Sequence, residues 1–155
     1  MAAFRFGLQK VLELREESEK KSAVGLAQAR REAADAERAR HDLEAVRDAG
    51  RARVAQARGA GGPVGHLQNL LYVVDQMDGK IAAAETVCRA ADEEVSRSMD
   101  SFREAVRQRS AIGQLKERRM GQWRTEEAQK ERKEMDEVAL TRHARVDGMN
   151  AGPGD

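Results

Sequence analysis

Apolar residues recur at alternating spacings of three and four positions through the second half of the chain. One series takes every seventh residue from Leu67, and the other takes every seventh residue from Leu70. Six of the seven positions in each series are apolar, the exceptions being Arg109 and Ser98. An average spacing of about 3.5 residues over many heptads is typical of the contact face, the a and d positions, of a coiled coil. The series are Leu67, Val74, Ile81, Cys88, Val95, Phe102 and Arg109, and Leu70, Met77, Ala84, Ala91, Ser98, Ala105 and Ile112.

The first half of the chain carries a weaker version of the same pattern. Its a and d positions include Leu8, Leu12, Leu26, Ala29, Ala33, Ala36, Leu43, Val54 and Ala57. The pattern is interrupted by Arg15, Glu19, Ser22, Arg40, Arg47 and Gly50. Each alanine that stands in place of leucine gives up roughly 2 kcal/mol of burial, at about 0.8 kcal/mol per methylene. We therefore expect a thin core, so that the fold is either dynamic or completed by a partner.

Four glycines and a proline between residues 59 and 65 form the strongest break in the helical pattern. A short connection between two long helices makes them antiparallel neighbours. The predicted fold is therefore all-α, two long helices in an antiparallel coiled-coil hairpin with a disordered C-terminal tail. The predicted bounds are a domain at 1–146, with a helix at about 4–58, a turn at 59–66 and a helix at about 67–146, and a disordered tail at 147–155.

The two predicted helices differ in length, so the last part of the second helix should extend past the N-terminus. Its apolar residues would then lack a partner within the chain, which makes this part a candidate docking surface. These residues are Leu115, Met120, Trp123, Met135, Val138 and Leu140.

Composition excludes several classes of protein. Charged residues make up 35% and aromatic residues 3% of the 155 positions, which disfavours a compact multilayer core. The 28 basic and 27 acidic residues nearly cancel, whereas a nucleic-acid binder needs a clustered basic excess. No apolar run is long enough for a signal peptide or a membrane span, so we expect an intracellular chain without direct membrane insertion.

No residue pattern indicates an active site. The three histidines, His41, His66 and His143, stand far apart without other metal ligands at suitable spacing. Cys88 falls on an a or d position, where cysteine usually acts as a small apolar residue. The glycine-rich stretch at 59–65 lacks the Gly-Lys-Ser/Thr ending of a phosphate-binding loop. We therefore predict that the protein is not an enzyme and binds no metal or cofactor.

The first sixteen residues are unusually apolar, with two of the three phenylalanines. The run Phe-Arg-Phe-Gly-Leu-Gln-Lys-Val-Leu-Glu-Leu-Arg-Glu at 4–16 resembles the opening of the FliJ family. Weaker resemblances follow at Leu71-Tyr72, at Gln-Leu-Lys-Glu-Arg (114–118) and at Lys-Glu-Met-Asp-Glu-Val-Ala (133–139). The chain departs from the family pattern in an Ala-, Arg- and Gly-rich middle, a glycine-rich turn and an added tail.

The resemblance implies a role in bacterial flagellum biogenesis, and so in chemotaxis, through type III protein export. FliJ proteins are antiparallel coiled coils similar to the central stalk of rotary ATP synthases. The end with both termini would enter the pore of the hexameric export ATPase, FliI, and the other end would face the membrane export gate, FlhA. Such a stalk promotes ATPase assembly, helps couple the proton motive force to export, and has been viewed as an escort for export chaperones. It would be cytoplasmic and held at the inner face of the cell membrane through the export apparatus.

The resemblance also assigns candidate partner-binding residues by position. Candidates toward the ATPase ring are Phe4, Phe6, Leu8, Val11, Leu12, Arg15, Leu115, Glu117, Arg118, Asp136 and Glu137. Candidates toward the export gate are Leu67, Leu71, Tyr72 and Met77. Two alternatives stay open: a generic coiled-coil scaffold that self-associates through its weak first helix, and the equivalent stalk of a virulence type III secretion system.

Overall fold

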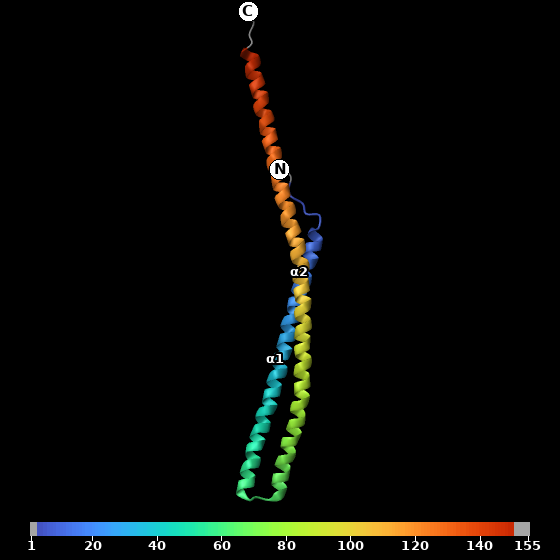
Figure 1. The fold of residues 1–155 in the computed structure, drawn as a ribbon, viewed down its shortest axis with the longest axis vertical. Helices are drawn as coiled ribbons and strands as arrows, with labels where there is room; N and C mark the ends of the chain where they lie inside the picture. Colours follow the sequence, from blue (N-terminus) through green and yellow to red (C-terminus); the bar gives the residue numbers. More distant parts are fainter. Residues whose placement is uncertain (1–2, 151–155) are drawn as a thin grey trace, which may run out of the picture. The chain divides into compact units, whose positions relative to one another are not determined.

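The fold consists of two long helices joined by a three-residue connection. A computed structural model describes residues 3–150, and the side chains of residues 3–145. Helix α1 spans Gln9–Ala60 and helix α2 spans Val64–Asn150, and the two run antiparallel from the turn (Figure 1). The predicted all-α antiparallel hairpin is therefore confirmed.

The chain divides into two compact units. The first, which we call the hairpin unit, comprises residues 15–107 and contains the turn. The second, the terminal unit, combines the residues up to 14 with those from 108 onward. Each unit pairs a piece of the first half of the chain with a piece of the second half.

Helix α1 begins five residues later than predicted. Residues 3–6 are not helical and residues 7 and 8 form a turn, after which the Gln9 N–H donates to the Phe6 carbonyl at 3.1 Å. Gly7 explains the late start, because glycine loses the most backbone freedom in a helix and costs about 1 kcal/mol relative to alanine. At the other end α2 continues to Asn150 instead of 146. Gly148 alone does not stop it, and the rest of the predicted tail, 151–155, lies outside the described residues.

The connection between the helices is shorter than the glycine-rich stretch that signals it. Gly61 has φ of +64°, a left-handed conformation that ends α1 and that only glycine adopts without strain. Pro63 follows, and its carbonyl accepts the N–H of Leu67 at 3.4 Å, so that proline begins the next helix without losing a donor that the helix needs. The predicted turn at 59–66 thus narrows to residues 61–63.

This tight turn sets the register of the hairpin unit. Gly50 faces Val74, Arg47 faces Asp78 and Glu37 faces Cys88, so the numbers of facing residues add up to 124 or 125 throughout. The helix ends at the turn obey the same relation. The register is therefore constant from the turn to Glu37 and Cys88.

The a and d positions predicted from the sequence form the contact between the helices. In the second helix all fourteen predicted positions from Leu67 to Ile112 are buried or partly buried, which confirms the prediction. The core is nevertheless thin, because no side chain among the described residues is completely enclosed. The buried apolar residues of the hairpin unit are Leu26, Ala29, Val54, Ile81 and Ala105.

Polar residues occupy a and d positions of α1 instead of breaking the contact. Arg40 keeps a quarter of its side chain exposed and pairs with Glu37 and Glu44, and this pairing lowers the pKa of the Glu37 carboxyl. Arg47 reaches across to Asp78 at 3.7 Å. Burial raises the pKa of the Cys88 thiol, and a hydrogen bond with Glu37 raises it further. The interruptions at Arg40 and Arg47 are therefore partly buried charges with partners.

Two glycines of α1 provide a test of this packing. A Cβ added to Gly25 would meet open space, whereas one added to Gly50 would lie 3.0 Å from the Val74 Cγ2 atom. We expect Gly25→Ala to raise the free energy of unfolding by about 0.5–1 kcal/mol, since alanine favours the helix. Gly50→Ala should raise the free energy of unfolding less, or lower it, because the Val74 side chain must move to make room for the new methyl group. Thermal unfolding followed by circular dichroism measures both, and equal gains would contradict the close approach.

Candidate partner-binding surfaces

The residues before α1 form a non-helical segment, 3–8, that packs against α2 within the terminal unit. We call it the N-terminal strap. The turn at Gly7 and Leu8 directs it onto the second helix, where it lines a hollow together with Leu115 and Trp123. A hydrogen bond from Lys116 Nζ to Gln9 Oε1, at 2.9 Å, fixes the first turn of α1 beside the same stretch of α2.

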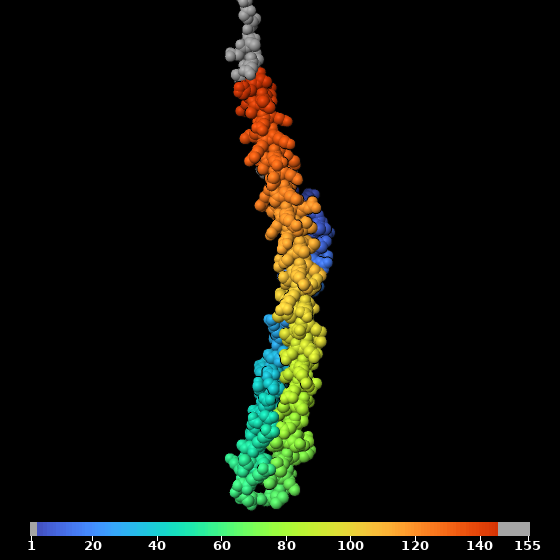
Figure 2. Space-filling model, in the orientation of Figure 1, coloured from blue at the N-terminus to red at the C-terminus, as the bar shows by residue number. Residues whose placement is uncertain are grey.

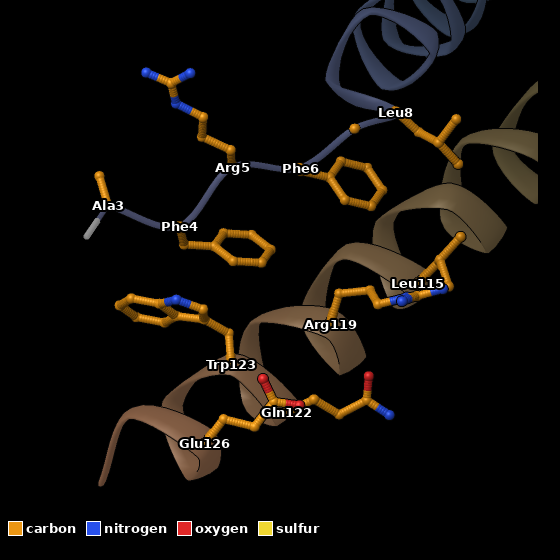
Figure 3. A pocket seen from close by; sticks show the side chains of 11 residues that line it. Ala3, Phe4, Arg5, Phe6, Leu8, Leu115, Arg119, Gln122, Trp123 and Glu126 are labelled. Carbon is orange, nitrogen blue, oxygen red and sulfur yellow. The ribbon is translucent and has the colours of Figure 1, made fainter. Parts of the chain in front are cut away.

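The principal contact of the strap is aromatic. The rings of Phe4 and Trp123 lie with their centroids 6.0 Å apart at an interplanar angle of 52° (Figure 3). A tilted pair at this distance contributes about 0.5–1.5 kcal/mol beyond the area it buries. Phe6 is also partly buried and points toward α2, whereas the Arg5 side chain points away from it (Figure 3). The alternation follows from an extended backbone, whose successive side chains face opposite ways.

A hollow of about 550 Å³ lies between the strap and α2. Its apolar lining comes from both phenylalanines, Leu8, Leu115 and Trp123, and its polar lining includes Arg119, Gln122 and Glu126. Apolar walls with a few polar groups suit an apolar side chain of another protein more than a charged small molecule. This hollow is therefore a candidate docking position.

The later part of α2 in the terminal unit has no covering segment. All described side chains from 128 to 145 are exposed, and Figure 2 shows this stretch without another segment over it. Met135 is 74% and Leu140 is 71% exposed, so large apolar side chains face solvent here. The predicted docking surface is thus confirmed as exposed in this part.

The earlier part of the predicted unpaired end is paired. Leu115, Met120 and Trp123 are partly buried in the terminal unit, where residues of the strap line hollows with them. The prediction of a free apolar end was therefore wrong for these three residues. It assumed that residues from 4 onward are helical, whereas Gly7 and Leu8 turn the strap onto α2.

The candidates toward the ATPase ring differ in accessibility. Leu12 is only 6% exposed and packs inside the terminal unit, so its side chain does not face a partner in this structure. Phe4, Phe6, Val11 and Leu115 are partly buried. The remaining candidates are exposed: Leu8, Arg15, Glu117, Arg118, Asp136 and Glu137.

The candidates toward the export gate lie near the turn of the hairpin unit. Leu67 and Met77 are partly buried at a and d positions, as their place in the heptads requires. Leu71 and Tyr72 are exposed, and Tyr72 keeps 65% of its surface open to solvent. Sequence reasoning missed the exposed Val64 and Val73 beside them. An apolar run over several helix faces, Leu-Leu-Tyr-Val-Val at 70–74, is the signal that could have identified them.

The described residues include neither a metal-binding group nor a membrane-spanning helix. Among residues 3–150 no group of three histidine, cysteine or acidic side chains could hold a metal ion. Neither helix, within that same range, has a stretch long and apolar enough to cross a membrane.

Trp123 is the chain's single tryptophan, so its fluorescence reports on the strap. We expect Phe4→Ala to shift its emission to longer wavelength and to speed its quenching by iodide, because the indole loses its aromatic cover. Arg5→Ala is the matched control, since Arg5 points away from α2 (Figure 3). Identical spectra for wild type and Phe4→Ala would show that the strap does not cover the indole in solution.

Comparison with known proteins identifies the family. No curated protein sequence matches the chain. Among solved structures, a chain described as a YscO homolog, CT670, from Chlamydia trachomatis has a similar fold, with a TM-score of 0.69 and 18% identity. The match covers 94% of this chain and 99% of that one. The family described as flagellar FliJ protein matches residues 4–148, nearly the whole sequence. The protein therefore belongs to the FliJ family of flagellar proteins.

Proposed function

We propose that this protein is the coiled-coil stalk of the flagellar protein export apparatus. In this role it links the hexameric export ATPase to the membrane export gate, promotes assembly of the ATPase ring and takes part in handling substrates and their chaperones. It acts as a non-enzymatic connector that is held at the inner face of the membrane by its partners.

The family match over residues 4–148 carries the proposal, because it includes both termini of the hairpin and its turn. It favours the flagellar role over the equivalent stalk of a virulence secretion system. The likeness to the chlamydial structure, at 18% identity, supports the fold alone.

The terminal unit offers the features that an ATPase ring would need. Leu8 is exposed at the end of the strap, and Glu117 and Arg118 are exposed on α2. Asp136 and Glu137 lie on the uncovered part of α2. This combination of apolar and charged side chains suits a protein interface, because buried apolar area contributes affinity and charge complementarity contributes specificity.

The hairpin unit supports the second contact of the stalk. Leu71 and Tyr72 are exposed next to the turn, and tyrosine is enriched where proteins bind one another. Leu67 and Met77 of the same helix are partly buried at a and d positions. We assign this surface to the export gate.

The thin core fits a protein that works inside an assembly. A generic scaffold would have to bury the exposed apolar residues by pairing with a second copy, and would then show concentration-dependent association. A stalk buries them against larger partners, so the free chain needs little internal stability. The ATPase measurement separates these two functions.

The first test measures hydrolysis and oligomeric state of the cognate export ATPase with and without the purified chain. We expect stimulated hydrolysis and ring formation with wild type, and at least about a tenfold weaker effect with Phe4→Ala/Leu8→Ala, since interface anchors typically contribute 1 kcal/mol or more each. Helicity should stay unchanged because both residues precede α1.

Leu12→Ala provides the structural control for that experiment. Leu12 is buried in the terminal unit, so its truncation should cost about 2 kcal/mol or more of stability and reduce the helical signal. If the wild-type chain leaves the ATPase unchanged and self-associates, the stalk function is wrong and the scaffold reading replaces it.

A second prediction concerns the other end of the hairpin unit. Leu71→Ala/Tyr72→Ala should reduce binding to the cytoplasmic part of the export gate protein, measured by pull-down or calorimetry, without changing ATPase stimulation. Val24→Ser/Val87→Ser is the control, because these residues are comparably exposed and lie elsewhere on the two helices. If both double variants bind the gate protein equally well, Leu71 and Tyr72 are not part of its binding surface.

A further inference from the structure

The turn end of the hairpin unit combines exposed apolar side chains with arginines, two of which have no acidic partner among the described residues. We define the hairpin tip as residues 49–74, the last turns of α1, the connection and the first turns of α2. This stretch contains three arginines and one histidine but no aspartate or glutamate. Over the whole chain the 28 basic and 27 acidic residues nearly cancel, so the tip, which lies between Asp48 and Asp75, is a local positive stretch.

Two of the three arginines have no acidic partner among the described residues. Arg51 pairs with Asp78 at 3.3 Å, outside the tip. Arg53 and Arg58 are exposed and make no ion pair within the described part of the chain. The register places Arg58 level with Leu67 and Arg53 level with Tyr72 along the hairpin.

The apolar side chains of the tip point in several directions. Val64, Leu71, Tyr72 and Val73 are all exposed, four of the twelve large apolar side chains that are exposed in the described chain. Successive residues of a helix point about 100° apart, so Leu71, Tyr72 and Val73 face three different ways. A groove on a folded partner covers one face of a helix. A lipid interface, by contrast, can cover side chains on several faces of a helix at once.

We propose that the hairpin tip binds the surface of an anionic lipid bilayer. The interfacial region accepts side chains from every side, tyrosine is favoured there, and arginines bind phosphate headgroups while their stems cover apolar surface. The span from Val64 to Val73 is about 14 Å at 1.5 Å per residue, enough to cross a headgroup layer of about 5–8 Å.

The connection limits the depth of this contact. Residues 61–63 are not helical, so their backbone groups need water or headgroups as hydrogen-bond partners and cannot enter hydrocarbon at low cost. The tip therefore touches the interface end-on and does not span the bilayer. The lipid contact uses Leu71 and Tyr72, the same residues that the proposed function assigns to the export gate, and vesicles without the gate protein test it separately.

The test measures binding of the full chain to vesicles by flotation. One set contains phosphatidylcholine alone, and the other contains equal parts of phosphatidylcholine and phosphatidylglycerol. We expect binding to the anionic vesicles that weakens as salt screens the charges, and little binding to the neutral ones. Equal binding to both sets, or binding to neither, would overturn the proposal.

Variants locate the contact on the chain. Arg53→Glu/Arg58→Glu should lower binding to anionic vesicles at least about thirtyfold, whereas Arg30→Glu/Arg31→Glu, the same reversal at exposed arginines elsewhere on α1, should retain most of it. Tyr72→Ser/Val73→Ser should weaken binding more than Val24→Ser/Val87→Ser. Equal losses in tip and control variants would mean that lipid contact is not localised at the tip.

The outcome is separable from that of the stalk function. A chain that binds the gate protein but neither vesicle would refute lipid binding and leave the stalk role standing. A chain that binds anionic vesicles without affecting the ATPase would support lipid binding and count against the stalk role.

Discussion

Facing residues of the hairpin unit keep one register, and that register begins at the three-residue connection. Gly61 ends α1 in a left-handed conformation, and Pro63 directly precedes α2. The connection is therefore too short to allow one helix to shift along the other. A slip of one residue would move Val54 and Ile81 out of the core and would separate Arg47 from Asp78. The core, the buried charges and the placement of the exposed residues near the turn all depend on this constraint.

The charged position Arg47 of α1 gives this register specificity at the expense of stability. Arg47 pairs with Asp78 of α2 in the observed register, whereas Arg40 pairs with Glu37 and Glu44 of its own helix. Replacing partly buried charges by apolar residues often stabilises a coiled coil but permits other pairings. The Arg47–Asp78 pair therefore favours the one register that satisfies it.

The surfaces available for partners lie where the coiled coil does not cover its own residues. In the terminal unit these are the strap with the hollow beside Trp123 and the uncovered stretch that includes Met135. In the hairpin unit they are the exposed apolar residues of the tip, such as Tyr72. Because the core is thin and no described side chain is fully enclosed, these surfaces hold much of the apolar area that a partner could cover.

Heptad spacing and the glycine cluster determined the helices, the antiparallel arrangement and the a and d positions of α2, because these follow from the local geometry of a helix and from a break in it. The family resemblance of residues 4–16 was also visible in the sequence alone. The tertiary structure decided the contacts between residues that lie far apart in the sequence. Phe4 meets Trp123 across more than a hundred positions, and Arg47 of α1 reaches Asp78 of α2. Such outcomes depend on which segments come together in space, and no periodicity along the chain encodes that.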